Sequence, residues 1–338
     1  NGWLDYNGYG WDTIVHELGH AIGLSHPGSY NFSANFSTTY TNGAEYAQDT
    51  RQYSIMSYWN TFDADFGSLN PAVARPVDMA TGLFTYPQTP MIHDIYVLQQ
   101  MYGADPTTRA GDTRYGFNST ADREIYDFSI NTSPYLAIYD AGGEDWIDMS
   151  GADAGVFIDL RSGSFSSGAV LPTLEEANDA VDSVNADFGG IAVLPWTEFS
   201  LANSVGGLGQ ANARLITATT GVSGVTALSY MNISIAYNTT IENVAGSNQR
   251  DYLVGNDGSN ILLGNEGDDV LAGLKGNDTL NGGDGLDVVS YTGVENDEHV
   301  GVIVDLSSGN VHTTSEGTDT FISIEGLFGS DYNDTLTG

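Results

Sequence analysis

Apolar residues recur every nine positions in the second half of the chain, from Gly246 to Ser290. Five consecutive nine-residue units each open on a glycine and carry an apolar residue at the eighth position, and a sixth unit spans 329–337. The eighth positions are Leu253, Leu262, Leu271, Leu280, Val289 and Leu336. This period predicts a parallel β-roll, in which each unit forms a glycine-rich turn and a short strand whose apolar side chain points into a narrow core.

An acidic residue stands at the sixth position of most of these units. The residues are Asp251, Asp269, Asp278, Asp287 and Asp334, with Asn260 in the second unit. Calcium takes six to eight oxygen ligands, so carboxylates beside turn carbonyls favour calcium over magnesium. A flexible Gly/Asp linker is the alternative, and the leucines that stay in phase argue against it. We therefore expect several Ca²⁺ ions between the coils, with weaker sites where a unit departs from the pattern.

A longer repeat surrounds the short one. The similar segments are 143–151 with 285–293, 155–165 with 301–311, and 240–247 with 322–330. We therefore expect two related β modules in a domain that covers residues 109–338. The first module carries an insertion at about 166–232, in which residues 171–184 are acidic and helix-like. We expect this insertion to be a long surface excursion, and a surface that faces substrate or a partner is the alternative.

The first 108 residues follow a helical pattern in two places. Residues 90–102 predict a helix, with Pro90 near its start and Gly103 at its end. The other place holds three of the six histidines of the chain, in the pattern H-E-x-x-H-x-x-G-x-x-H. The residues of the pattern are His16, Glu17, His20, Gly23 and His26.

This histidine pattern predicts a metal site. His16 and His20 are one helical turn apart, so both imidazoles can reach one ion. Gly23 can leave the helix with a positive φ, which lets His26 return as a third ligand. Glu17 is close enough to act on a water at the metal without being a ligand. Three histidines with an open fourth position indicate catalytic zinc, and the fit at every fixed position argues against three unrelated surface histidines.

Composition narrows the function classes. The 338 residues include 44 acidic and 9 basic side chains, a formal charge of −35, and no cysteine. Nucleic acid is excluded as a partner, because phosphate binding needs clustered Lys and Arg. No apolar run approaches the roughly 20 residues of a membrane span. Without cysteine, neither a disulfide framework nor a cysteine-rich structural zinc site can form.

The histidine segment and the residues after it resemble the metzincin endopeptidases, and their serralysin branch in particular. Residues 54–58 read Ser-Ile-Met-Ser-Tyr and are similar to the Met-turn of that family, and Pro27 and Gly28 follow the third histidine. The resemblance implies that Met56 supports the zinc site and that Tyr58 is a further zinc ligand or stabilises the oxyanion. It implies an α+β catalytic portion in residues 1–108, with the zinc helix and Met-turn, followed by an all-β parallel β-roll or sandwich.

The resemblance also implies calcium sites at the top of the roll, built from carbonyls and acidic side chains. The implied positions are Arg109, Gly111, Thr113, Asp140, Gly142, Gly143, Asp145, Thr240 and Glu242. With one catalytic Zn²⁺ and several Ca²⁺, the implied protein acts on protein or peptide substrates. The resemblance further implies secretion from a bacterium by a type I pathway without a cleaved N-terminal signal peptide.

One departure from the family lies at the beginning of the chain. Metzincins place a twisted sheet before the zinc helix, but here only 15 residues precede His16, and they are rich in Gly, Asn and Tyr. We therefore expect the chain to be part of a longer polypeptide, whose N-terminal segment would be a partner of the catalytic portion.

These observations predict a secreted zinc endopeptidase in which Glu17 is the general base. Two alternatives belong to other classes. One is a calcium-dependent binding or surface-layer module with a vestigial zinc site. The other is a fragment that is active only with its missing N-terminal half. The presence of Glu17, Met56 and Tyr58 favours the enzyme, because a decayed site would tolerate their loss.

Overall fold

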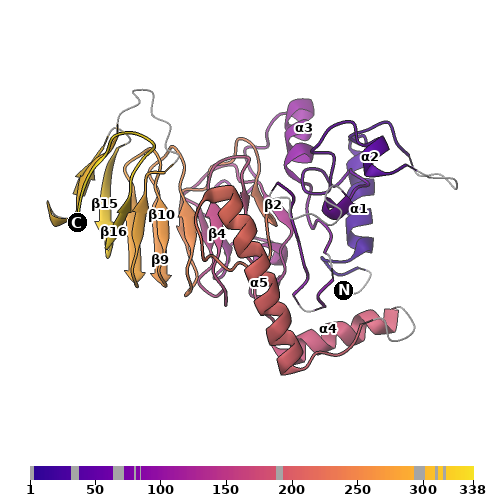
Figure 1. The fold of residues 1–338 in the computed structure, drawn as a ribbon. Helices are drawn as coiled ribbons and strands as arrows, with labels where there is room; N and C mark the ends of the chain where they lie inside the picture. The colour runs from indigo at the N-terminus through magenta and orange to yellow at the C-terminus, as the bar shows by residue number, and fades with distance from the viewer. Residues whose placement is uncertain are drawn as a thin grey trace.

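The computed structural model describes residues 4–31, 38–63, 72–79, 81–83, 85–187, 193–292, 301–308, 311–314 and 317–338. The N-terminal helices lie at one end of the molecule and the C-terminal strands at the other (Figure 1). The helices are α1 (Tyr9–Ala21), α2 (Tyr40–Gly43), α3 (Ile92–Tyr102), α4 (Leu174–Asp187) and α5 (Glu198–Thr220), with 3-10 turns at Thr61–Asp63, Glu124–Tyr126 and Leu306–Ser308. Within these described ranges, no helix is long and apolar enough to cross a membrane.

Two large sheets run through the described part of residues 114–328. In spatial order, the seven-stranded sheet holds β1 (Arg114–Gly116), β3 (Trp146–Asp148), β7 (Asn243–Ala245), β9 (Ile261–Glu266), β11 (Thr279–Asp284), β15 (Thr318–Ile322) and β14 (Val311–Thr313). The five-stranded sheet holds β16 (Gly326–Phe328), β12 (Val288–Ser290), β10 (Val270–Ala272), β8 (Tyr252–Val254) and β4 (Phe157–Asp159). Smaller sheets join β2 (Leu136–Ile138), β6 (Ile233–Ile235) and β5 (Phe165–Ser166), and β13 (Ile303–Asp305) with β17 (Thr335–Thr337).

Successive nine-residue units supply strands to the two large sheets in turn. Consequently, paired strands of neighbouring coils are 18 residues apart in sequence, and they are parallel. Leu253 lies opposite Leu271 in one sheet, and Leu262 lies opposite Leu280 in the other. Two units therefore complete one coil, and the parallel β-roll predicted from the nine-residue period is confirmed.

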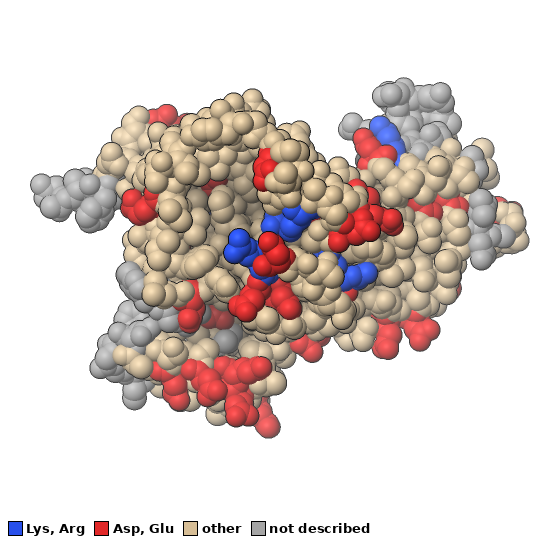
Figure 2. Space-filling model, turned by 180° about the vertical axis from the view of Figure 1, so that it is seen from behind, with Lys and Arg blue, Asp and Glu red and all other residues tan. Residues whose placement is uncertain are grey.

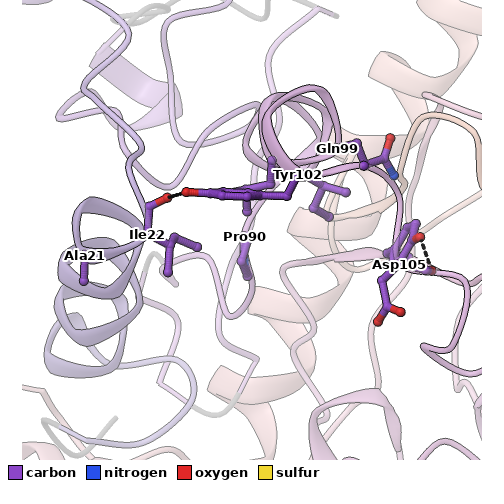
Figure 3. Close-up of a pocket in the computed structure, with 10 residues that line it drawn as sticks. Ala21, Ile22, Pro90, Gln99, Tyr102 and Asp105 are labelled. Carbon is purple, nitrogen blue, oxygen red and sulfur yellow. Dashed lines mark hydrogen bonds between the residues drawn. The ribbon is translucent and has the colours of Figure 1, made fainter.

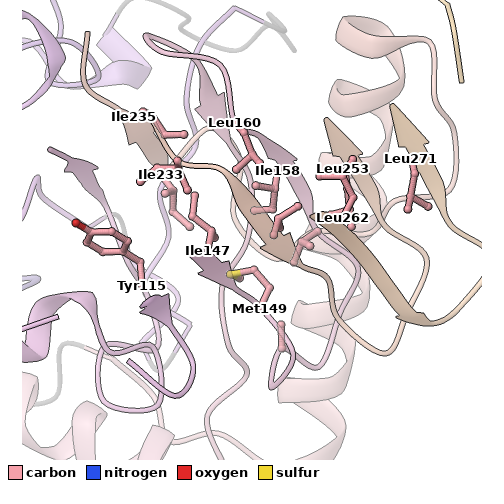
Figure 4. Close-up of a cluster of buried hydrophobic side chains, with 14 of the residues drawn as sticks. Tyr115, Ile147, Met149, Ile158, Leu160, Ile233, Ile235, Leu253, Leu262 and Leu271 are labelled. Carbon is pink, nitrogen blue, oxygen red and sulfur yellow. The ribbon is translucent and has the colours of Figure 1, made fainter. Parts of the chain in front are cut away.

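The eighth-position side chains fill the space between the two sheets (Figure 4). Those that are at most 1% exposed are Leu253, Leu262, Leu271, Leu280 and Val289. The same core continues into the first module through Ile147 and Ile158. Leu336 departs from this pattern, since it is 39% exposed. Its strand β17 pairs with β13 in a separate two-stranded sheet and does not extend either large one.

The insertion at 166–232 contains two helices. The acidic helix predicted at 171–184 is α4, shifted by three residues at each end. The second helix, α5, was not predicted, because Gly206, Gly207 and Gly209 lower the helix propensity of its sequence.

α5 forms a second layer over the roll. Thr197 caps its N-terminus by accepting a hydrogen bond from Ser200 N, and Gly221 ends it in the left-handed conformation. Its residues Leu215 and Ile216 are buried against the outer face of the five-stranded sheet, where they meet Tyr252, and α5 crosses that sheet in Figure 1. This half of the insertion is therefore part of the core and not a surface excursion.

Candidate functional site

α1 carries the first two histidines of the pattern one turn apart. The helix ends at Ala21, and Gly23 takes φ 101°, a left-handed value that glycine adopts without a side-chain clash. The chain then returns, so that Nε2 of His26 lies 3.2 Å from Nε2 of His16 and 3.1 Å from Nε2 of His20. The three predicted ligands therefore meet at one point.

A backbone carbonyl holds the other ring nitrogen of each histidine. The Nδ1–carbonyl pairs are His16 with Ile55, His20 with Leu24, and His26 with Tyr30, each at 2.9 Å. Because a carbonyl only accepts, the proton of each neutral imidazole is on Nδ1 and the lone pair is on Nε2. Three lone pairs therefore face one another, and a cation between them would relieve their repulsion.

The geometry fits zinc. Three imidazoles bound to zinc in a tetrahedral arrangement would have their nitrogens about 3.3 Å apart, close to the distances found here. The side chains of His16, His20 and His26 form a group whose ligand atoms all lie within 4.8 Å of one another. Burial lowers the pKa of His16 and of His26, which favours the neutral form that binds metals.

Met56 lies directly against the zinc helix. It is 1% exposed and packs with Leu24 and Ile55. A Cβ added at Gly19 would lie 2.5 Å from Sδ of Met56, so only glycine lets the helix approach the methionine so closely. Since the carbonyl of Ile55 also accepts from His16, residues 54–58, the segment similar to a Met-turn, contact α1 through Met56 and fix the orientation of one histidine ring.

Asp94 on α3 fixes the Met-turn in place, and sequence reasoning missed it. Its carboxylate accepts hydrogen bonds from Ser54 Oγ at 2.6 Å, Ile55 N at 2.7 Å and Met91 N at 2.8 Å. Burial raises the pKa of Asp94 to about 6, and these hydrogen bonds act against that rise. An Asp near the start of a predicted helix is usually a solvent-exposed charge that stabilises the helix N-terminus. The sequence pattern therefore did not indicate that Asp94 is buried and holds residues 54 and 55.

Glu17 and Tyr58 border the three histidines. The ring of Tyr58 has its centroid 4.4 Å from that of His26 and 5.9 Å from that of His16. The Glu17 side chain is exposed, and its charge raises the pKa of His26 against the larger lowering by burial. A carboxylate and a phenol therefore both lie close to the three histidines.

A separate apolar pocket of about 600 Å³ lies beyond the end of α1 and against α3 (Figure 3). Its lining includes Ile22, Ile95 and Leu98, and Tyr102 donates a hydrogen bond to the Ile22 carbonyl at 2.7 Å. None of the three histidines lines it. His93 on the same helix packs against Tyr53, with ring centroids 5.1 Å apart, and does not belong to the metal group.

A second set of polar groups runs along the roll. Ahead of several strands, a carboxylate oxygen accepts a hydrogen bond of 2.7–3.0 Å from a backbone N–H of the neighbouring coil. Beside the five-stranded sheet, the N–H of Val156 donates to the Asp251 carboxylate, and the N–H of Asp251 donates to that of Asp269. In the same way, the N–H of Asp269 donates to Asp287 and the N–H of Asp287 donates to Glu325. Beside the seven-stranded sheet, the N–H of Thr113 donates to Asp145 and the N–H of Asp145 donates to Glu242. Further along, the N–H of Asn260 donates to Asp278 and the N–H of Asp278 donates to Asp319. We call these two series the carboxylate ladders.

The second oxygen of several ladder carboxylates is buried without a hydrogen-bond partner. These atoms are Oδ2 of Asp145, Asp269, Asp278 and Asp287. Burial is the largest effect that raises the pKa of Asp145, Asp269 and Asp278 to about 7. A buried, unpaired carboxylate oxygen is costly unless a cation satisfies it. The ladders therefore fit calcium.

Backbone oxygens converge on the same points. A Cβ added at Gly264 would lie 2.2 Å from Oδ2 of Asp269 and 2.4 Å from the carbonyl oxygen of Gly282 in the next coil. Carboxylate and carbonyl oxygens from two coils therefore approach one another, as a calcium site between coils requires.

Among the positions implied at the top of the roll, most come together. A Cβ added at Gly143 would lie 2.7 Å from the Gly111 carbonyl oxygen, beside the ladder residues Thr113, Asp145 and Glu242.

The other positions predicted to bind calcium make hydrogen bonds within the protein or are exposed. Both oxygens of Asp140 accept hydrogen bonds, from Tyr115 Oη and Gly142 N. Arg109 donates to the Tyr115 hydroxyl, and the side chain of Thr240 is exposed. In the last unit, Asp334 accepts from Val302 N and Ser330 Oγ. As calcium ligands, these positions stay predictions.

Known protein families match the same regions. The family described as Peptidase M10 serralysin C terminal matches residues 104–184, and the family of RTX calcium-binding nonapeptide repeats matches residues 238–271 and 263–292. The chain is therefore similar to serralysins over part of its length. The repeats predicted at 246–290 are thereby confirmed as calcium-binding nonapeptide repeats of the RTX family, whereas the unit at 329–337 lies outside the matched residues.

Several curated serralysins align with the chain. Serralysin B of Dickeya chrysanthemi is 43% identical over 166 residues, Metallopeptidase AprA of Pseudomonas marginalis is 41% identical over 163, and the serralysin of Photorhabdus luminescens is 40% identical over 166. Each alignment covers 48% of this chain and 31% or 32% of the relative. The chain therefore matches about a third of the length of these serralysins.

Proposed function

We propose that this chain is a zinc-dependent endopeptidase, or the zinc-carrying part of one. The observation that carries the proposal is that Nε2 of His26 lies 3.1–3.2 Å from Nε2 of both other histidines, with every Nδ1 fixed by a backbone carbonyl. Such a preorganised three-nitrogen site leaves a fourth position open, which is the arrangement of catalytic and not structural zinc.

The neighbouring side chains suit peptide hydrolysis. Zinc held by His16, His20 and His26 would supply Lewis acidity toward water and the scissile carbonyl. Glu17 accepts the proton of the attacking water and returns it to the leaving amine. Tyr58 would donate a hydrogen bond to the oxyanion of the tetrahedral intermediate, or would help to hold the zinc as a further ligand.

We propose that the substrates are proteins or peptides and that the enzyme works outside the cell. Calcium modules that function extracellularly bind at Kd values of about 10⁻⁴ to 10⁻³ M, and the ladders require calcium on this proposal. The absence of cysteine is compatible with export, because folding needs no oxidation.

Replacing Glu17 with alanine tests the general base. The variant Glu17→Ala should keep one bound zinc and lose casein hydrolysis by about 10²–10⁴-fold. Zinc content by elemental analysis and the rate of casein hydrolysis are measured together. Glu175→Ala, an exposed acid on α4, is the matched control and should change neither.

Two outcomes would contradict the proposal. Undiminished hydrolysis by Glu17→Ala removes its role as base. A wild-type chain that binds zinc and calcium but hydrolyses no casein favours the alternatives, a calcium-dependent binding module or a fragment that needs its N-terminal half.

A further inference from the structure

The ladder residues differ in how their second polar atom is satisfied. In the coils that contain Asp269, Asp278 and Asp287, that atom is a buried oxygen without a partner. In the first coil of the repeats, residues 246–262, the protein itself supplies every such partner. The difference lies in Ser247, Asn256 and Asn260.

Asn260 is 1% exposed and stands at the sixth position of its unit. Its Oδ1 accepts from Asn256 N at 2.8 Å, and its Nδ2 donates to the Glu242 carbonyl at 2.7 Å. Since a carbonyl only accepts, this contact fixes the orientation of the amide. The amide N–H thus points at the preceding coil, where an aspartate would present an oxygen.

Asn256 reinforces the same contact. Its Nδ2 donates to the Ile241 carbonyl at 2.9 Å, and its Oδ1 accepts from Asn260 Nδ2 at 3.1 Å. Two amides therefore bind the Ile241 and Glu242 backbone carbonyls of the coil before. In the next coil of the same sheet, the equivalent carbonyl, that of Asn260, accepts a hydrogen bond from Thr279 N at 2.8 Å, so the Asn260 amide takes the place of a strand hydrogen bond.

The opposite ladder is also complete at this coil. Oδ2 of Asp251 accepts from Ser247 N at 2.6 Å, and its Oδ1 accepts from Ser247 Oγ at 2.8 Å and Val156 N at 2.7 Å. No oxygen of Asp251 is among the unpartnered buried atoms of the described residues.

We propose that the first repeat coil is independent of calcium, because the N–H groups of Ser247 and Asn256 already satisfy the side-chain oxygens of Asp251 and Asn260 whose counterparts in the later coils lack a partner. This coil separates two cation-dependent regions, one at Asp145 and one that begins at Asp269. The inference rests on the proposed calcium binding of the roll, and it identifies the repeat coil that folds without bound calcium.

Calcium stoichiometry of the full chain tests this, by equilibrium dialysis and elemental analysis with zinc held constant. Asn260→Asp should bind about one more calcium than the wild type, because the new carboxylate replaces the donor by an oxygen ligand. The double variant Asn256→Gly with Asn260→Asp, which also removes the second amide, should do the same. Unchanged stoichiometry in both variants would overturn the inference.

Asp278→Asn on the same ladder is the control for calcium binding itself and should lose about one calcium. If it loses none, the proposed calcium role of the ladder fails, whatever Asn260→Asp shows.

Hydrogen exchange of the wild-type chain gives a second measurement if a variant does not fold. In EGTA, amides of residues 252–262 should stay protected at least about tenfold longer than those of 270–290. Longer protection of 270–290 than of 252–262 would contradict the inference.

Discussion

At the scale of single residues, Gly19 decides how closely the zinc helix meets the Met-turn. Gly19→Ala should destabilise the fold by about 1–2 kcal/mol, because overpacking against buried Met56 outweighs the gain in helix propensity of about 1 kcal/mol. Chemical denaturation measures the change. Gly207→Ala in α5, where an added Cβ meets nothing within 4 Å, is the matched control and should stabilise.

A double variant separates overpacking from other causes. If the contact with Met56 is responsible, Gly19→Ala should cost much less in a Met56→Ala background. An equal cost in both backgrounds would contradict this explanation.

Asp94 should make stability depend on pH. Burial raises its pKa from 3.8 to about 6, so the folded state holds this proton more tightly than the unfolded chain. Its contribution to stability is complete below about pH 4 and is lost as pH rises through about 6. Relative to Asp94→Asn, the unfolding free energy of the wild type should fall by up to about 3 kcal/mol over that interval. Parallel pH profiles for the two proteins would refute this.

Only some contacts of the histidine site could be predicted from the sequence. The spacing of the histidines fixed the metal group, since helix geometry alone places His16 and His20 together. The contact of His16 Nδ1 with the Ile55 carbonyl and that of Asp94 with Ser54 join residues 39 and 40 positions apart in sequence. No local pattern predicts such contacts, because they depend on how α3 packs against the Met-turn.

At the scale of elements, calcium should hold the strands β9 to β12 together. Chelation with EGTA in zinc-replete buffer should lower the melting temperature, because each site saturated at a hundred times its Kd contributes about 2.7 kcal/mol. Circular dichroism measures the shift, and calcium but not magnesium should reverse it. A melting temperature that EGTA leaves unchanged would argue against calcium in the ladders.

Elements were predictable where their period was regular. The nine-residue repeat gave the roll and its buried leucines, and the Pro90–Gly103 interval gave α3 to within two residues. α5 was missed because its glycines disfavour a helix locally, whereas burial of Leu215 and Ile216 on the sheet stabilises it. Tertiary packing overrode propensity there.

At the scale of the whole molecule, the predicted boundary at residue 108 does not separate two independent cores. Met91 and Ile92 at the start of α3 pack with Tyr135 and Ala137 from the β2 region. Acidic side chains far outnumber basic ones over the surface in Figure 2, in keeping with the formal charge of −35. Bound cations would offset this repulsion in the roll, and the shared core would pass that stabilisation to the helical end.

The 18-residue offset between paired strands has a consequence for how the roll forms. Within the strands β7 to β12, each new coil closes a loop of the same short length against the coil before it, so the entropy of closure does not grow from one of these coils to the next. Contacts that join only neighbouring coils let folding spread from one coil to the next. A first coil that needs no ion would be the fixed starting point for folding of the roll. Each later coil would then fold as calcium binds to it.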